Sequence, residues 1–457
     1  MSARLVLQSR WCSAALLGAA LWVQGRPARA NPADTYGLGA RSTALGSAVA
    51  ASSTDYSAGY YNPAGFARGR GSELALGYAA VAHHLEISGE DSRVDPVRGV
   101  TGGLVARGSV VTVPVAVGIS ARISDDRLSR FRTRRPEDVH WLRYDDRPQL
   151  LYLSVAAALR PLSWLSLGGG IAMLSATTGS FRVTGTAVQP DGRDRSTADS
   201  ELQHEVNIDL TPRSYPILGV SVTPADGVTW ALVYRGEATV DFDVRGEFEG
   251  EVETAAFTVP AAYQVASRAA SAFIPQQVVL GLEVSPSEDL AVELDLTYLN
   301  WSAYQSPFSQ TDSRLEVEVP PGLLDLPPET RPSLTLDPEF QDRIVPRLGV
   351  EWRVDAHPRV AVPVRAGYFF EKSPVPQQTA RTNFVDPDRH VLSAGTGLVW
   401  RDPAEWLPGR VRFACFAQLS ILPTRITLKE NPGDFVGDYR AQGTIVAVGA
   451  DLGLELP

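Results

Sequence analysis

Histidines are the residues on which acid–base and metal chemistry most often depends. The chain has six: His83, His84, His140, His204, His357 and His390. A serine hydrolase places a nucleophile beside a histidine, and the element Gly-x-Ser-x-Gly is absent from the sequence. His83 and His84 are adjacent on a predicted strand, so they point to opposite faces and cannot share a metal ion. Two cysteines, Cys12 and Cys415, are too few for a thiolate cluster or a disulfide framework. We therefore expect no enzyme, no cofactor and no metal site.

A second group of residues stands out by small size. Residues 31–71 are rich in Gly and Ala, with isolated aromatic side chains. Gly37-Leu38-Gly39 falls short of a dinucleotide-binding motif, because position 42 is Ser and no strand precedes it. About forty residues of this kind have too little bulk for a core of their own. We expect them to pack inside a structure that is already folded and to act there as a plug.

Residues 1–30 have the pattern of a secretory signal peptide. Arg4 and Arg10 give a positive start, an apolar stretch of 13 residues follows at 11–23, and Ala28-Arg29-Ala30 offers a cleavage site. The apolar stretch is too short to span a bilayer as a helix. The whole chain carries a formal net charge of −10, and the signal segment holds four arginines and no acid. The acidic balance disfavours nucleic acid as a partner.

The rest of the chain, residues 72–457, alternates between apolar and polar residues with period two. In 290–298 one face carries Leu, Val and Tyr, and the other carries Ala, Glu, Asp and Thr. Residues 343–354 repeat the arrangement. Successive strand side chains point to opposite sides of a sheet, so this pattern predicts strands with one apolar face. Many segments exceed the five or six residues, roughly, that are usual in soluble proteins.

The predicted connections alternate between short and long. Short ones fall near 108–109, 161–163, 224–226, 286–287, 355–357 and 402–408. Long ones cover about 89–98, 124–147, 185–203, 246–270, 303–341, 372–388 and 422–440. Six short and seven long connections join fourteen strands. We expect an all-β protein, a 14-stranded antiparallel transmembrane barrel of the outer membrane, with lipid against its apolar face and charges inside.

Aromatic residues near the predicted strand ends suit the girdles that such barrels place at both membrane interfaces. We expect this of Tyr234, Tyr298, Trp301, Trp352, Tyr368 and Trp400.

The small-residue segment carries the clearest likeness to known proteins. The sequence Gly-Leu-Gly-Ala-Arg-Ser-Thr-Ala-Leu-Gly at 37–46, followed by Tyr-Asn-Pro-Ala-Gly at 61–65, resembles the FadL/TodX family of outer-membrane transporters. Weaker strand motifs agree at 347–351, 365–368 and 388–395. The resemblance implies a fourteen-stranded barrel with an N-terminal hatch in its lumen. It also implies uptake of hydrophobic compounds, either long-chain fatty acids or aromatic hydrocarbons. A predicted second strand at about 99–107 is short for this family.

The resemblance also implies a route: capture among external loops, transfer to a pocket beside the hatch, hatch rearrangement, and exit through a gap in the barrel wall. Apolar residues in the predicted loops 246–270 and 303–341 would form the capture groove. We expect Asn62-Pro63-Ala64 to face the wall opening. Pro114 and Gly118 would interrupt pairing in the third strand, because Pro cannot donate to the ladder. The side chains expected to line the pocket are Tyr36, Leu38, Tyr60, Tyr61 and Phe66.

Two alternatives stay open. A nonspecific porin or a structural barrel would share the strand pattern but would conduct ions regardless of the N-terminal residues. A barrel enzyme is disfavoured by the missing nucleophile motif. We expect hydrophobic small molecules and membrane lipid as partners, and a monomer.

Overall fold

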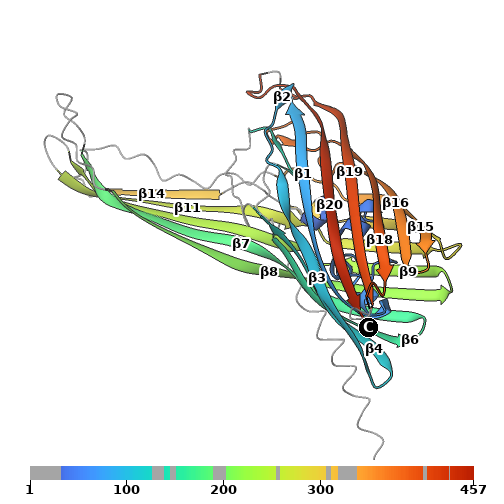
Figure 1. Cartoon of the computed structure of the whole chain (residues 1–457). Coiled ribbons are helices and arrows are strands. Elements are labelled where there is room, and N and C mark those ends of the chain that lie inside the picture. The colour runs from blue at the N-terminus through green and yellow to red at the C-terminus, as the bar shows by residue number, and fades with distance from the viewer. Residues whose placement is uncertain are drawn as a thin grey trace, which may run out of the picture.

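A computed structural model describes residues 32–125, 138–144, 151–188, 202–253, 258–304, 310–317, 337–404, 409–431 and 433–457. The predicted signal peptide lies outside these residues. Fourteen strands form a closed antiparallel barrel (Figure 1), in the order β1 Ser72–Ile87, β3 Val97–Val110, β4 Val113–Ser124, β6 Leu151–Leu162, β7 Leu165–Val188, β8 Leu202–Ala225, β9 Val228–Arg235, β12 Gln277–Val284, β13 Leu290–Leu299, β15 Arg343–His357, β16 Val360–Glu371, β18 Arg389–Arg401, β19 Arg410–Thr427 and β20 Tyr439–Leu456. The last strand pairs with the first along the whole length of β1, which closes the barrel.

The period-two pattern explains which face is outside. On β13, Leu294 and Leu296 are 46% and 47% exposed, whereas Glu293 and Asp295 between them are 0% and 5% exposed. Exposed apolar side chains recur on the other strands of the barrel in the same way. An apolar outer surface with charges inside is the reverse of a soluble protein and matches a barrel surrounded by lipid.

Aromatic side chains mark both ends of this outer surface. Trp352 and Trp400 lie near the end with short connections, and Tyr298 and Tyr368 lie near the opposite end; all four are exposed. The prediction was wrong for Trp301. It begins the 3₁₀-helix η2 Trp301–Ala303, is 3% exposed, and packs in an interior aromatic cluster.

The short and long connections alternate as predicted. The β3–β4 turn lies at residues 111–112, so the second strand has 14 residues and is not short. Within 246–270, the described residues 246–253 and 258–270 are also not a loop. They belong to β10 Ala238–Glu253 and β11 Thr258–Ile274, which pair with each other and, with β14 Gln310–Val317 and the far parts of β7 and β8, form an arm that projects from the barrel (Figure 1). β10 runs parallel to β7 there.

The long connections build a roof over one end of the barrel. β5 His140–Trp141 pairs with β17 Phe384–Val385, two segments that lie far apart in the sequence. Phe384 of β17 also belongs to an aromatic cluster, here called the roof cluster, made of Phe273, Trp301, Tyr304, Phe340 and Phe384. The small strand β2 Glu90–Asp91 pairs antiparallel with the last residues of β1.

The N-terminal segment, residues 32–71, lies inside the barrel (Figure 1), and most of its side chains are buried. Its helices are short: α2 Pro32–Tyr36, α3 Ala40–Ala44, α4 Ala58–Tyr61 and the 3₁₀-helix η1 Pro63–Arg68. Short helices are weak on their own, so the segment depends on the surrounding wall for its conformation. Within the part of the chain that the structure describes, no helix has the length and apolarity that a membrane-spanning helix needs.

Candidate functional site

The wall holds the N-terminal segment mainly by its backbone. Carboxylates accept from its amides: Asp451 Oδ2 lies 2.5 Å from the Ala40 nitrogen, and Asp295 Oδ2 lies 3.0 Å from the Ala50 nitrogen. Hydrogen-bond donors on six other strands bind its carbonyl oxygens, namely Arg107, Arg122, Tyr152, Arg235, Arg347 and Arg389. Short helices leave many backbone groups unpaired, and these inward side chains satisfy them.

One side chain of the segment carries a charge into a buried ion-pair cluster. Arg41 donates to both oxygens of Glu351, at 3.2 and 3.3 Å, and lies 3.7 Å from Glu293. Arg365 from the wall also binds Glu351. Burial alone lowers the pKa of Arg41, but the carboxylates of Glu351 and Glu293 raise it above its ordinary value, so the guanidinium stays charged.

Glycines in the wall allow the segment to approach the strands closely. A Cβ atom at Gly168 would lie 2.3 Å from the Ala64 nitrogen, and one at Gly367 would lie 2.1 Å from the Gly46 nitrogen. Neither distance is possible for a real side chain. The small residues of segment 31–71 are therefore matched by glycines in the strands that face them.

Asn62 joins two parts of the segment to the wall. Its Nδ2 donates to the Ala50 carbonyl oxygen at 2.7 Å and to Ser221 Oγ at 2.9 Å. Its Oδ1 accepts from the Ala64 nitrogen at 3.1 Å, which caps η1, where Pro63 is the first residue. Asn62 is 1% exposed, so each of these bonds is shielded from water.

The wall in front of Asn62-Pro63-Ala64 consists of β7 and β8. Gly168 and Gly219 are paired residues of these strands, and both contact this part of the segment. We expected an interrupted third strand there. That strand, β4, is paired in register with β3 and β6 through Gly118. Pro114 lies at the hairpin end opposite Ser109, and Gly118 accommodates the Phe66 ring. Within the described ladder, neither residue interrupts pairing.

A small cavity lies between the N-terminal segment and the roof. Its volume is about 40 Å³, room for roughly three water molecules. Tyr60 and Tyr61 of the segment line it. Further lining residues come from the wall and the roof, among them Arg143, Arg235, Asp295, Leu299, Trp301, Arg347 and Glu371.

The other predicted pocket residues are buried elsewhere. The Tyr36 hydroxyl forms a hydrogen bond of 3.0 Å with His83 Nε2, and the Tyr36 side chain packs below the roof. Leu38 and Phe66 belong to the apolar packing between the segment and the barrel wall. They anchor the segment and do not line this cavity.

Charged and aromatic groups are stacked on the cavity wall. The Arg235 guanidinium lies 4.5 Å from the centre of the Tyr60 ring, and the Tyr60 hydroxyl binds Asp34. Burial, together with Asp34, raises the pKa of Tyr60 well above its usual range, although Arg235 opposes this, so the hydroxyl stays neutral. Arg347 lies 4.1 Å from the centre of the Phe369 ring. Among the described residues it has no carboxylate at ion-pair distance.

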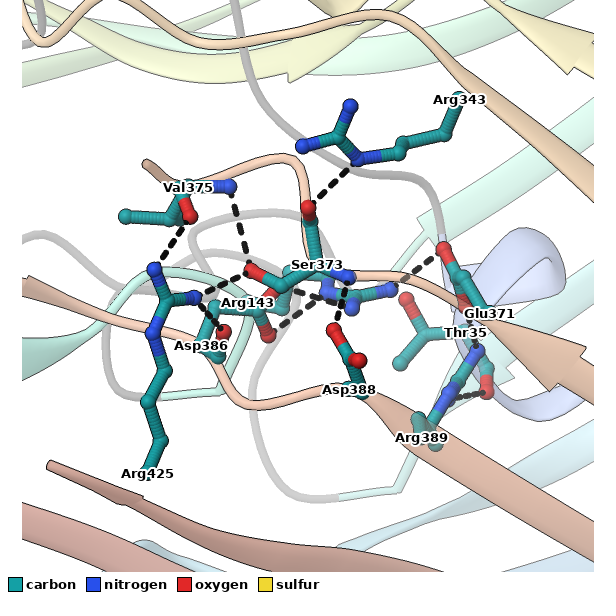
Figure 2. A network of polar contacts seen from close by, with 10 residues as sticks. All are labelled: Thr35, Arg143, Arg343, Glu371, Ser373, Val375, Asp386, Asp388, Arg389 and Arg425. Carbon is teal, nitrogen blue, oxygen red and sulfur yellow. Dashed lines mark hydrogen bonds and ion pairs between the residues drawn. The ribbon is translucent and has the colours of Figure 1, made fainter. Parts of the chain in front are cut away.

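A buried ion-pair network joins the roof to the segment (Figure 2). Arg143 binds both oxygens of Asp386, at 3.0 and 2.8 Å, and Glu371 at 2.6 Å. Arg389 binds the other oxygen of Glu371 at 2.6 Å and donates to the Thr35 carbonyl at 3.0 Å. Two external connections are thereby linked to the first helix of the segment. We call Arg143, Glu371, Asp386 and Arg389 the latch.

Sequence reasoning found some of these residues and missed others. Asp295 and Arg347 lie on the polar faces of alternating strands, which marks them as inward. Arg143 lies in a connection without periodicity, and no local signal singles it out. Among the described residues, no group of three or more His, Cys, Asp or Glu side chains could hold a metal ion.

A family model described as outer membrane protein transport protein (OMPP1/FadL/TodX) matches residues 149–408, more than half of the chain. The chain belongs to this family. It is an outer-membrane transport protein, and the resemblance stated above is confirmed. Comparison with curated protein sequences gives no match.

Solved structures of this family share the fold. A FadL homologue from Pseudomonas aeruginosa is 12% identical, with 91% of this chain and 97% of that chain covered and a TM-score of 0.55. The CymD monoaromatic hydrocarbon channel is 17% identical, with 92% and 97% covered and a TM-score of 0.53. The Pseudomonas putida toluene transporter TodX is 13% identical, with 92% and 99% covered and a TM-score of 0.52.

Proposed function

We propose that this protein carries hydrophobic compounds inward across the outer membrane, through the cavity between the roof and the N-terminal segment. The observation that carries the proposal is the segment itself, which is buried inside the barrel and bonded to strands around its circumference. Solved relatives are named as a toluene transporter and a monoaromatic hydrocarbon channel. Residues 31–71 are, in this proposal, a plug.

Passage requires the plug to move. A cavity of about 40 Å³ is too small for an acyl chain, since ligand pockets usually occupy several hundred Å³. An apolar chain gains about 0.8 kcal/mol for each methylene that leaves water. This gain is available to open the contact between the roof and the segment. The latch connects the external connections to Thr35, so a ligand that displaces the roof also loosens the start of the segment.

Exit then follows through the wall that faces Asn62-Pro63-Ala64. The adjoining parts of β6, β7 and β8 hold small residues at 156–158, 168–170 and 219. Small side chains leave little bulk between the segment and the lipid. We therefore assign the lateral exit to this region, in place of the third strand.

The substrate end that reaches the cavity is anionic in this proposal. Arg347 faces the cavity and donates to the Gly46 carbonyl, a neutral acceptor. A carboxylate would find there a charge-assisted partner that an aromatic hydrocarbon does not need. This favours long-chain fatty acids over hydrocarbons. Uptake of oleate and of toluene into cells should separate the two: Arg347→Met lowers the first and leaves the second unchanged. Equal loss of both would remove the assignment.

A nonspecific porin is the competing function, and conductance distinguishes it. In planar bilayers, the purified barrel should conduct ions weakly, and deletion of residues 31–50 should open a large, steady conductance. Asn62→Ala should lower fatty-acid uptake while the barrel still assembles. If neither change has an effect, the protein is a porin or a structural barrel. We also propose that it acts as a monomer, which the mass of the detergent-solubilised particle tests.

A further inference from the structure

A second, larger cavity lies on the outside of the barrel, at the end with long connections. Its volume is about 630 Å³, and it is formed by the ends of β15, β16, β18 and β19 with the connection 372–388. The side chains that matter for its chemistry are Arg343, Phe370, Lys372, Asp388, His390 and Arg425.

Strand alternation places this cavity at the lipid boundary. On β16, Tyr368 is exposed and Phe369 and Glu371 are buried, so Phe370 and Lys372 continue the outward row. On β18, His390 is in the same outward row as exposed Leu392. The cavity therefore opens above an apolar surface, with aromatic rings at its lower edge.

The cavity has an excess of positive charge. Lys372 is exposed and makes no hydrogen bond or ion pair with any residue that the structure describes. Among the described residues, the acceptors of Arg343 and Arg425 are neutral: Arg343 donates to the Ser373 carbonyl at 2.5 Å, and Arg425 donates to the Val375 carbonyl at 2.7 Å. The lining carboxylate is Asp388, which accepts from the Ser373 nitrogen at 2.9 Å.

The two guanidinium groups are fixed in place. Arg343 and Arg425 approach Ser373 from different sides (Figure 2), and Arg425 also donates to Ser373 Oγ and to the Asp386 carbonyl. Ser373 is 2% exposed and is bonded to the latch through Asp386 Oδ2 at 3.1 Å. Cations held in this way lose little entropy when an anion binds.

We propose that this cavity binds the phosphate-bearing headgroup of an anionic lipid in the outer leaflet, with the acyl chains along the apolar surface of β16 and β18. Three cations and one carboxylate suit a doubly charged phosphate, and Arg and Lys are its usual ligands. The aromatic and apolar side chains below the cavity suit the lipid tails. A soluble anion would use the charges but would gain nothing from that lower surface.

Binding to the full-length protein in neutral detergent tests the proposal. Native mass spectrometry can titrate it with diphosphorylated lipid A, with monophosphoryl lipid A, and with phosphatidylcholine, a zwitterion of zero net charge, as the reference. We expect affinity to fall in that order. Lys372→Glu should weaken lipid A binding about tenfold, because one cation becomes an anion beside the phosphate. The matched control is Arg353→Gln, an exposed cation near the opposite end of the barrel, which should leave binding within about twofold.

Three results would overturn the proposal. Equal affinity for lipid A and phosphatidylcholine would show that the net negative charge of the headgroup is not recognised. Unchanged binding in Lys372→Glu would place the lipid elsewhere; this exposed residue has no bond whose loss could unfold the barrel. Displacement of lipid A by millimolar inorganic phosphate, or by micromolar oleate, would assign the cavity to a free anion or to transport substrate instead.

Discussion

Asn62→Ala tests how firmly the segment is held. The change removes two donors, to the Ala50 carbonyl and to Ser221, and the acceptor for the Ala64 nitrogen. A buried hydrogen bond contributes about 1 kcal/mol, and a buried carbonyl left unpaired costs about 1–3 kcal/mol. We expect a loss of roughly 3 kcal/mol in the free energy that keeps the segment docked, or about a hundredfold in its opening equilibrium.

Two further variants divide this effect. Ser221→Ala removes one of the three bonds and should open the segment about fivefold. Asn62→Asp keeps the acceptor for the Ala64 nitrogen but loses both donors and buries a charge, so it should resemble Asn62→Ala. Hydrogen exchange of residues 48–64, measured by mass spectrometry on the folded barrel, reports local opening. Residues 290–299 of β13 are the internal reference and should exchange as in the wild type.

The reasoning fails if Asn62→Ala exchanges within threefold of the wild type at residues 48–64. In that case the buried bonds of Asn62 do not hold the segment, and its docking rests on packing alone. Faster exchange in β13 as well would mean that the whole barrel is destabilised and that local opening was not measured.

Three more predictions concern the contacts of the segment. Gly168→Ala would place a Cβ 2.3 Å from the segment's backbone, whereas Gly108→Ala meets nothing within 4 Å; protease should cut the segment faster only in the first, at a cost of about 1–3 kcal/mol. Arg41→Ala removes the ion pair of the buried Glu293 carboxylate and leaves Glu351 with Arg365 alone. It should destabilise the protein by about 3–5 kcal/mol in thermal unfolding. As the control for Arg41→Ala, Arg353→Ala removes the solvent-exposed ion pair with Asp355 and should change stability by less than about 1 kcal/mol. Arg389→Met should raise hydrogen exchange at residues 32–38 about tenfold, and equal exchange would show that the latch does not reach the segment.

The barrel could be predicted because the residues of each strand alternate between those that face lipid and those that face the interior. Leu294 and Leu296 face outward and Glu293 and Asp295 inward, so two residues of sequence suffice to read the orientation. Strand number followed from the alternation of connection lengths. The arm could not be predicted in this way, because strands beyond the membrane no longer need an apolar row.

The contacts of the latch could not be predicted from the sequence for a different reason. Arg143 meets Glu371 and Asp386 across 228 and 243 residues. Only the closure of the barrel brings them together. Trp301 shows the remaining difficulty: a tryptophan at a strand end suits a membrane girdle and an interior cluster equally well, and only the folded position distinguishes them.

The bond between Ala40 and Asp451 spans 411 positions and has a consequence for biogenesis. Asp451 belongs to β20, the final strand, which also forms the seam with β1. The residue that accepts the Ala40 amide hydrogen is therefore synthesised 411 positions after Ala40. Residues 32–71 therefore cannot form all their contacts with the wall before β20 is in place. A folding intermediate that lacks β20 would lack the hydrogen bond between the Ala40 amide and Asp451.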